Sequence, residues 1–169
     1  MKNTAFKLWL LSALSIVGFS CQQDDQLSEL VRDNRPAVPV TFTEATTFGF
    51  NPYVETSLAA GGNIRFTLSI PAGSGRTIRE ITKVGAGPTA VNAATLNGAS
   101  YTSAPIPGNG TTAVFTTTIN QFKTKFTEEE AKTTPVALPN FTEIAFIFLV
   151  TLDDDTQIVT QQARVRILP

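Results

Sequence analysis

The stretch from Phe141 to Leu152 constrains the fold of this chain more than any other part of its 169-residue sequence. In an extended chain, successive side chains point to opposite faces, and here both faces are apolar. One face carries Ile144, Phe146, Phe148 and Val150, and the other carries Ala145, Ile147 and Leu149. A strand of this kind is buried on both sides, so the sequence predicts that it lies in the centre of a sheet.

Four other segments alternate between apolar and polar residues with the period of two that is typical of strands. Residues 63–70 give the clearest pattern, with one apolar face and one polar face. Residues 111–119 alternate in the same way, and residues 156–168 predict a C-terminal hairpin with the stretch described above. Residues 38–43 are predicted to form an edge strand, because Pro39 cannot donate a hydrogen bond to a neighbouring strand.

The segments between these strands carry less regular signals. Residues 77–84 place apolar side chains three positions apart, which suits a helix, but their short length between glycines favours a bulged strand. Residues 99–106 are predicted to form a short strand between two Asn-Gly turns. Residues 127–130, Thr-Glu-Glu-Glu, match a capping box, so one short helical turn is expected near residues 127–132.

About seven or eight short strands within residues 37–169 predict an all-β domain. The expected architecture is a two-sheet antiparallel β-sandwich, with a jelly roll as the main alternative. The layout resembles the immunoglobulin-like and fibronectin-III-like modules of bacterial surface lipoproteins. This resemblance rests on the strand pattern alone, because the Cys…Trp…Cys signature of antibody domains is absent.

The N-terminus has the pattern of a secretory signal. Lys2 and Lys7 give a positive start, and an apolar run follows over residues 8–19. This run is too short to cross a bilayer as a helix, which needs about 20 residues. We therefore expect residues 1–20 to be a cleaved signal peptide and the polar residues 21–36 to tether the folded domain.

Residues 18–21, Gly-Phe-Ser-Cys, resemble the lipobox of bacterial lipoproteins. Cys21 is the only cysteine in the chain, and it stands directly after the expected cleavage site. The resemblance implies that Cys21 carries lipid, which also removes a thiol that would otherwise be open to oxidation. A protein cut at the same position and secreted without lipid is the alternative interpretation.

The residues that follow Cys21 bear on sorting. In lipoproteins of this kind, an Asp directly after the cysteine can retain the protein in the inner membrane, and this chain has Gln22 there. The resemblance therefore implies an outer-membrane location with the lipid as the anchor. The pair Asp24-Asp25 resembles short acidic tags that bring some lipoproteins to the cell exterior, and a solvated tether is the alternative interpretation.

The composition argues against catalysis. The chain has no histidine and its one cysteine is the expected lipid site, so the commonest general base and a thiol nucleophile are both missing. With 13 basic and 14 acidic residues, it has no basic stripe that would suit nucleic acid. We therefore expect no enzyme activity, no nucleic-acid partner and no cofactor beyond the covalent lipid.

A run of three aspartates is the candidate metal site of the sequence. Asp153, Asp154 and Asp155 offer hard oxygen ligands that could hold Ca²⁺. Aspartate also tolerates turn geometry, and a hairpin turn is the interpretation that we favour.

Four aromatic residues form the candidate ligand surface: Phe48, Phe50, Tyr53 and Tyr101. They are expected on loops at one end of the sandwich, where binding residues are commonly found. Rings that close the end of the sandwich are the alternative interpretation. The sequence thus predicts a surface-anchored, non-catalytic binding or adhesion module for a glycan or a protein. A structural accessory subunit of an outer-membrane assembly is the alternative function.

Overall fold

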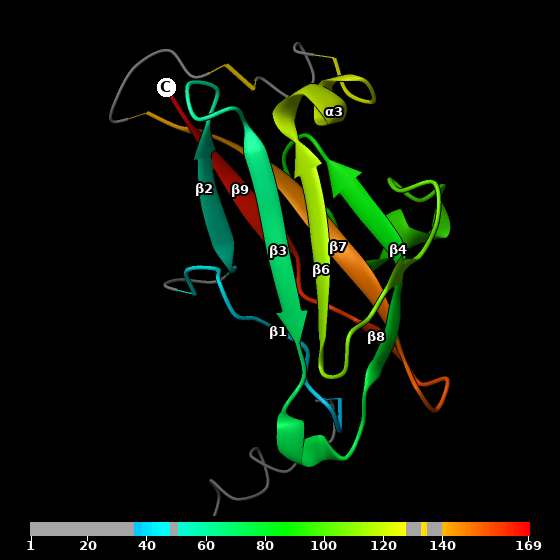
Figure 1. The fold of residues 1–169 in the computed structure, drawn as a ribbon. Coiled ribbons are helices and arrows are strands. Elements are labelled where there is room, and N and C mark those ends of the chain that lie inside the picture. The colour runs from blue at the N-terminus through cyan, green and yellow to red at the C-terminus, as the bar shows by residue number, and fades with distance from the viewer. Residues whose placement is uncertain (1–35, 48–50, 128–132, 135–139) are drawn as a thin grey trace, which may run out of the picture. The chain divides into compact units, whose positions relative to one another are not determined.

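Two β-sheets form the framework of the part of the chain that the structure describes (Figure 1). The computed structural model describes residues 36–47, 51–127, 133–134 and 140–169. Within it, Val38–Pro169 forms one compact unit. The predicted all-β class is confirmed, because strands dominate the described part of the chain and its helices are short.

The smaller sheet has three antiparallel strands in the order β1-β3-β6. These are β1 (Thr41–Phe42), β3 (Asn63–Ser69) and β6 (Thr112–Thr118). In β3 the buried residues Ile64, Phe66 and Leu68 alternate with more exposed ones, as predicted. β1 lies at the edge of this sheet, so the prediction of an edge strand after Pro39 is also confirmed.

The larger sheet has the order β2-β9-β7-β4-β5, and β8 pairs with β7 outside this path. Its strands are β2 (Tyr53–Ser57), β4 (Ile78–Gly87), β5 (Ile106–Pro107), β7 (Thr142–Leu152), β8 (Gln157–Val159) and β9 (Ala163–Leu168). β7 lies between β4 and β9, which confirms the predicted central strand and C-terminal hairpin. β2 and β9 are parallel, so the prediction of purely antiparallel sheets is wrong for this pair.

Both faces of β7 are buried, as its sequence predicts. Phe146 and Phe148 belong to the core shared with the smaller sheet. Ala145 and Ile147, on the other face, pack beneath the segment that contains the 3-10 helix η3 (Ala93–Asn97). A loop and not a second sheet therefore covers the outer face of the central strand.

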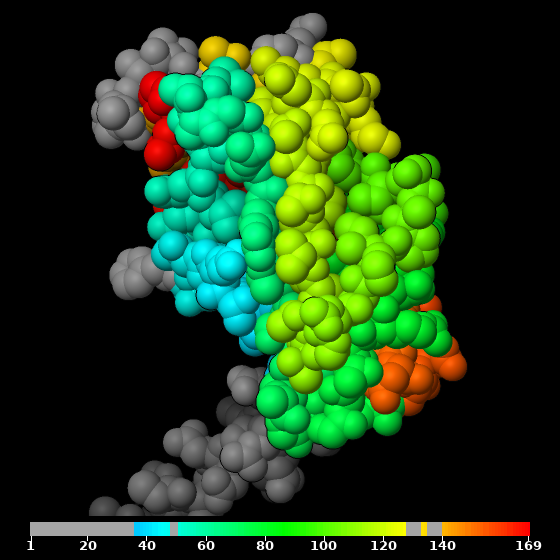
Figure 2. Space-filling view, viewed as in Figure 1, coloured from blue at the N-terminus to red at the C-terminus, as the bar shows by residue number. Residues whose placement is uncertain are grey.

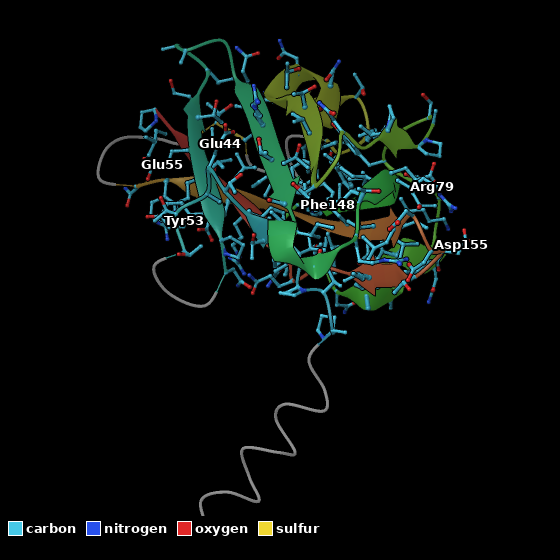
Figure 3. All side chains as sticks on the ribbon, turned by 60° about the horizontal axis from the view of Figure 1, so that its bottom comes forward. Glu44, Tyr53, Glu55, Arg79, Phe148 and Asp155 are labelled. Carbon is cyan, nitrogen blue, oxygen red and sulfur yellow. The ribbon has the colours of Figure 1, made fainter. Side chains whose placement is uncertain are left out.

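Aromatic rings fill the space between the two sheets. Phe66 and Phe115 of the smaller sheet contact Phe146 and Phe148 of β7, with ring centroids 5.2 to 6.1 Å apart. All four pairs are tilted or edge-on, which is the arrangement that the ring quadrupoles favour. Figure 3 shows Phe148 in the middle of the described side chains, so the two sheets share one core.

β4 is a bulged strand, as predicted for residues 77–84. Its pairing with β7 changes register twice. The first shift lies between Ile78 and Glu80, and the second lies between Ile81 and Lys83. Each extra residue shifts the side chains that follow, which explains why the apolar positions are three apart instead of two.

The strand predicted over residues 99–106 is largely wrong. Ile106 pairs with β4 as part of the two-residue β5, whereas the residues before it form bends. Asn97 does not begin a hairpin turn, because it is the last residue of η3, whose first turn is capped by Asn92. A capped 3-10 helix thus replaces the expected turn, and irregular backbone with bends takes the place of most of the expected strand.

The α-helix of the described residues is the short α3 (Ile119–Lys123). It begins at a capping box, in which the Thr118 hydroxyl accepts from the Gln121 N–H and the Gln121 side chain accepts from the Thr118 N–H. The helical turn predicted near residues 127–132 lies outside the described residues except for Thr127. Within the described ranges, no helix is both long and apolar enough to span a membrane.

Candidate functional site

The predicted site residues do not form one surface in the described part of the chain. Phe48 and Phe50 lie outside the described residues, as does Cys21. Tyr53 begins β2 and contacts Arg166 on the outer face of the larger sheet. Tyr101 instead inserts its ring among the core aromatics at the β6 side of the fold. The two tyrosines therefore belong to separate sites.

Tyr101 lies at the boundary between the core and the surface. Its ring centroid is 5.5 Å from that of Phe146 and 6.0 Å from that of Phe115. Its hydroxyl lies 2.8 Å from the Thr117 hydroxyl oxygen. Burial raises the pKa of Tyr101 above its ordinary value of 10.0, and the hydrogen bond with Thr117 offsets only part of this rise. The phenol is therefore neutral at physiological pH.

A cleft of about 350 Å³ opens beside Tyr101, and we call it the β6 cleft. Its walls come from the segment before β5, from β6 and from α3, and they consist of Tyr101, Thr102, Ser103, Thr116, Thr117, Gln121, Thr124 and Lys125. A smaller hollow of about 180 Å³ shares Tyr101 and Lys125 with it. Figure 2 shows β6 and α3, coloured yellow-green to yellow, at the surface of the face that the cleft occupies.

Hydrogen bonds and a cation–π contact connect several of the polar side chains that line the cleft. The Thr117 hydroxyl donates to Gln121 Oε1 over 3.0 Å, and the same oxygen accepts the Thr118 N–H of the capping box. The Lys125 ammonium lies 5.2 Å from the centre of the Tyr101 ring, within the range of a cation–π contact. These lining residues offer hydroxyl, amide and ammonium groups but no carboxylate, imidazole or thiol. The cleft can therefore hold a ligand by hydrogen bonds.

Sequence reasoning identified Tyr101 in this cleft and missed the rest of its lining. Threonine and serine are common throughout the chain, so no single one stands out in the sequence. One usable signal was present, because Thr118 and Gln121 have the Thr-x-x-Gln spacing of a capping box. That spacing locates α3 and hence the end of the cleft.

A second surface surrounds Tyr53 on the outer face of the larger sheet. The Arg166 guanidinium lies 3.7 Å from the Tyr53 ring centre and 4.7 Å from the Phe141 ring centre. Glu143 accepts hydrogen bonds from Arg164 and from Arg166, the latter over 3.0 Å. Phe141 is 43% exposed, but each charged group here already has a partner of opposite charge. These contacts join β2, β9 and β7, so we assign this surface a role in stability and not in binding.

Glu143 makes the stability of this surface depend on pH. Its burial alone would raise the pKa of the carboxyl, but the hydrogen bonds and charges of Arg166 and Arg164 outweigh burial and lower that pKa below 4.5. A lowered pKa in the folded state stabilises the fold at neutral pH. That stabilisation is lost as the pH falls from about 4.5 through the pKa of the folded state.

The variant Glu143→Gln is expected to lower the free energy of unfolding by about 1–2 kcal/mol at pH 7. The difference in unfolding free energy from the wild type is expected to shrink as the pH falls below 4.5, the ordinary pKa of the group. As the pH falls through the lowered pKa of the folded state, the wild-type carboxyl also becomes neutral. Urea unfolding between pH 3 and pH 7 measures both. Glu55→Gln removes a charge from an exposed position of β2 and serves as the control. A difference that stays constant with pH would contradict this assignment.

The three aspartates form the turn between β7 and β8, in line with the turn interpretation. Asp155 has a φ of 67°, which is left-handed backbone that aspartate tolerates. Arg76 pairs with Asp153 and Asp154, and Arg79 pairs with Asp155. Figure 3 shows Arg79 and Asp155 on the opposite side of the fold from Tyr53. In the residues that the structure describes, no group of three acidic, histidine or cysteine side chains is placed to hold a metal ion.

Melting the protein in millimolar Ca²⁺ and in chelator is expected to give the same Tm. The arginines already supply the positive charge that a cation would bring, and a ligand that binds only the folded state would raise the Tm. Differential scanning fluorimetry makes the comparison, with Mg²⁺ as the control cation. A Tm that rises with Ca²⁺ and not with Mg²⁺ would contradict the turn interpretation.

Comparison with known proteins does not assign the chain to a family. No protein-family model matches it, and no curated protein and no solved structure gives a significant match. The function of the domain is therefore inferred from the β6 cleft and from the surfaces around it.

Proposed function

We propose that the protein is an outer-membrane lipoprotein whose immunoglobulin-like domain binds a protein partner, without catalysis, through the β6 cleft. The observation that carries this proposal is a polar cleft beside an open edge of the smaller sheet, since β6 ends the order β1-β3-β6. A partner protein can use both features together, the side-chain groups of the cleft and the backbone of the strand next to it.

The strand order supports the immunoglobulin-like part of the proposal. Such sandwiches place strands A, B and E in one sheet and C, F and G in the other, with C′ beside C. The chain matches this order when β1, β3 and β6 are taken as A, B and E. β4, β7 and β9 then correspond to C, F and G, and β5 corresponds to C′.

The lipid anchor is proposed from the sequence around Cys21. Gly-Phe-Ser-Cys at residues 18–21 resembles a lipobox, and an anchor at that position would hold the domain to a membrane through the polar tether. Mass spectrometry of the protein from its native membrane tests the anchor. We expect an N-terminus at a lipid-modified Cys21, and we expect Cys21→Ser to move the protein to the soluble fraction. An intact leader or a free thiol would overturn this part of the proposal.

The cleft favours a protein over a glycan. Sugars commonly stack on an open aromatic face, but the Tyr101 ring packs into the core and Lys125 lies over it. Catalysis is not proposed, because the lining holds no carboxylate, imidazole or thiol and burial keeps the Tyr101 phenol protonated. A non-catalytic docking site suits the groups that are present.

Affinity capture from the detergent-solubilised envelope, run in parallel with a glycan array, tests the proposal. Ser103 is an exposed residue of the cleft wall, so Ser103→Trp fills the cleft, whereas Gln161→Trp adds the same ring at an exposed position between β8 and β9. We expect a protein that is retained by the wild type and by Gln161→Trp and is lost from Ser103→Trp. A glycan whose binding Ser103→Trp abolishes, or capture that neither variant changes, would overturn the protein-binding assignment.

A structural accessory subunit of an outer-membrane assembly is the second candidate. It is favoured by the open edge of β6, which a neighbouring subunit could cover permanently. A competition experiment distinguishes the two functions. A binding module releases its captured partner when excess unlabelled domain is added, whereas a permanent subunit stays associated in a fixed ratio through the same wash.

A further inference from the structure

The hydrogen bonds of the smaller sheet reveal which backbone groups of β6 face outward. The Ile119 N–H donates to the Gly62 oxygen over 2.9 Å, and the Ile70 N–H donates to the Thr111 oxygen over 3.0 Å. In an antiparallel pair, residues that face each other alternate between bonded and non-bonded pairs. With the register of β3 and β6, the bonded positions of β6 are therefore the odd-numbered ones. The N–H and C=O groups that point away from β3 belong to Thr112, Val114, Thr116 and Thr118.

Two of these four residues already have local partners on that side. Thr112 exchanges backbone hydrogen bonds with Asn109 over 2.7 and 3.1 Å, and the Thr118 N–H donates to Gln121. Val114 and Thr116 remain. No strand among the described residues pairs with β6 on the side away from β3, so these two residues present a short row of backbone donors and acceptors.

The other sheet edges carry features that discourage pairing, and β6 does not. β1 and β5 have two residues each, β8 has three, and β5 includes Pro107, which has no N–H. β2 has the charged Glu55 in the middle of the strand. β6 has seven residues without a charge or a proline. Because open edges pair readily with other chains, proteins usually protect them, and this edge lacks the usual protection.

The β6 cleft adjoins this same edge. Thr116 supplies one of the outward backbone groups and also lines the cleft, as Tyr101 does. Side chains of an added strand would alternate between solvent and the cleft. Lys125 is the one charged side chain among the cleft-lining residues, so the cleft suits a polar or acidic side chain.

We infer that an extended segment of the partner protein pairs with β6 at Val114 and Thr116 as an added strand and places a polar or acidic side chain in the β6 cleft. This inference rests on the proposed function and names how the partner binds. Only an extended polypeptide repeats donors and acceptors at the spacing that the two residues present. The position is that of strand D, which follows E in the immunoglobulin-like order used above.

Hydrogen exchange of the unbound full-length protein tests the free edge itself. The amides of Val114 and Thr116 are expected to exchange about 100-fold faster than those of Ala113 and Phe115, because the latter two face β3. Slow exchange at Val114 and Thr116 in the unbound protein would overturn the inference, since it would mean that the edge is already covered.

A display library of random twelve-residue peptides tests the strand addition. Thr116→Pro removes one outward N–H and leaves the bonds to β3 in place, which an edge strand tolerates. Thr116→Ala keeps the backbone and removes the hydroxyl. We expect selected peptides to bind the wild type and Thr116→Ala alike and to bind Thr116→Pro about tenfold or more weakly.

Three further measurements make each outcome decisive. Bound peptide is expected to protect the amides of Val114 and Thr116 in the wild type, a result that does not depend on whether Thr116→Pro folds. Peptides that are lost from Ser103→Trp but protect neither amide would overturn strand addition and leave the proposed function standing. Peptides unaffected by Ser103→Trp would overturn both. Sedimentation shows whether the wild type forms a dimer. If it does and Thr116→Pro abolishes the dimer, the strand that pairs with β6 belongs to a second copy of this chain, and the inference of a partner protein is overturned.

Discussion

Phe146→Ala is expected to lower the free energy of unfolding by about 3–5 kcal/mol. Phe146 has no exposed surface, and its ring contacts those of Phe66, Phe115, Phe122 and Tyr101 at centroid distances of 5.2 to 6.1 Å. Truncation removes apolar contacts to both sheets and leaves a cavity that rings from several elements cannot all fill. Urea unfolding followed by circular dichroism measures the change, and the midpoint is expected to fall while the slope stays the same.

Two controls separate the packing of Phe146 from general effects of truncation. Phe146→Leu keeps much of the apolar volume and is expected to cost roughly 1–1.5 kcal/mol. Val159→Ala truncates a side chain that is 45% exposed and is expected to change stability by no more than about 0.5 kcal/mol. Equal losses for Phe146→Ala and Val159→Ala would contradict the core described here. Because Tyr101 packs on Phe146, the alanine variant is also expected to weaken binding at the β6 cleft.

The strands were predictable where the information that specifies them is local. The alternation of residues 63–70 and the two apolar faces of β7 both follow from side chains pointing to opposite faces of a strand. Burial of the apolar side chains then stabilises each strand, and the structure confirms both of them. The bulged strand β4 was predictable for the same reason, because an extra residue leaves a visible change in the apolar spacing.

The parallel pairing of β2 with β9 could not be predicted in this way. It joins Tyr53–Ser57 to Ala163–Leu168, which are more than 100 residues apart in the sequence. Nothing in the alternation of either strand identifies its neighbour or its direction, because both patterns would also suit an antiparallel pair. In the folded chain Arg166 stacks on Tyr53 and Val54 packs against the core, and these contacts stabilise the pair without any signal in the local alternation.

One residue of the β6 cleft, Tyr101, could be predicted from the sequence, but the shape of the cleft could not. Tyr101 is one of two tyrosines in the chain and therefore drew attention, but its role depends on Thr117 and Lys125, which reach it from β6 and from beyond α3. The outward groups of Val114 and Thr116 are backbone atoms, and backbone atoms have no sequence signal of their own. The edge becomes visible only when the hydrogen-bond register of the sheet is known.

Gly108→Ala is expected to lower the free energy of unfolding by about 3 kcal/mol or more, although the residue lies outside the core. A Cβ atom at Gly108 would overlap the carbonyl oxygen of Ile78 and lie 2.7 Å from its carbonyl carbon. Both atoms belong to the backbone of β4, so no side-chain rotation can relieve the overlap. The Gly108 N–H also donates to the Arg79 oxygen over 2.8 Å, and a shift large enough to admit the methyl group would break this bond.

Gly73→Ala is the matched control for Gly108→Ala. Gly73 lies in the 3-10 helix η2 (Ala72–Ser74), and a Cβ atom there would meet no other atom within 4 Å. Its substitution is expected to change stability by no more than about 0.5 kcal/mol in the same urea titration. Gly108 ties the segment that forms one wall of the β6 cleft to the start of β4, so its loss should widen the cleft as well as weaken the fold. A Gly108→Ala protein as stable as Gly73→Ala would contradict the close approach of these two backbone segments.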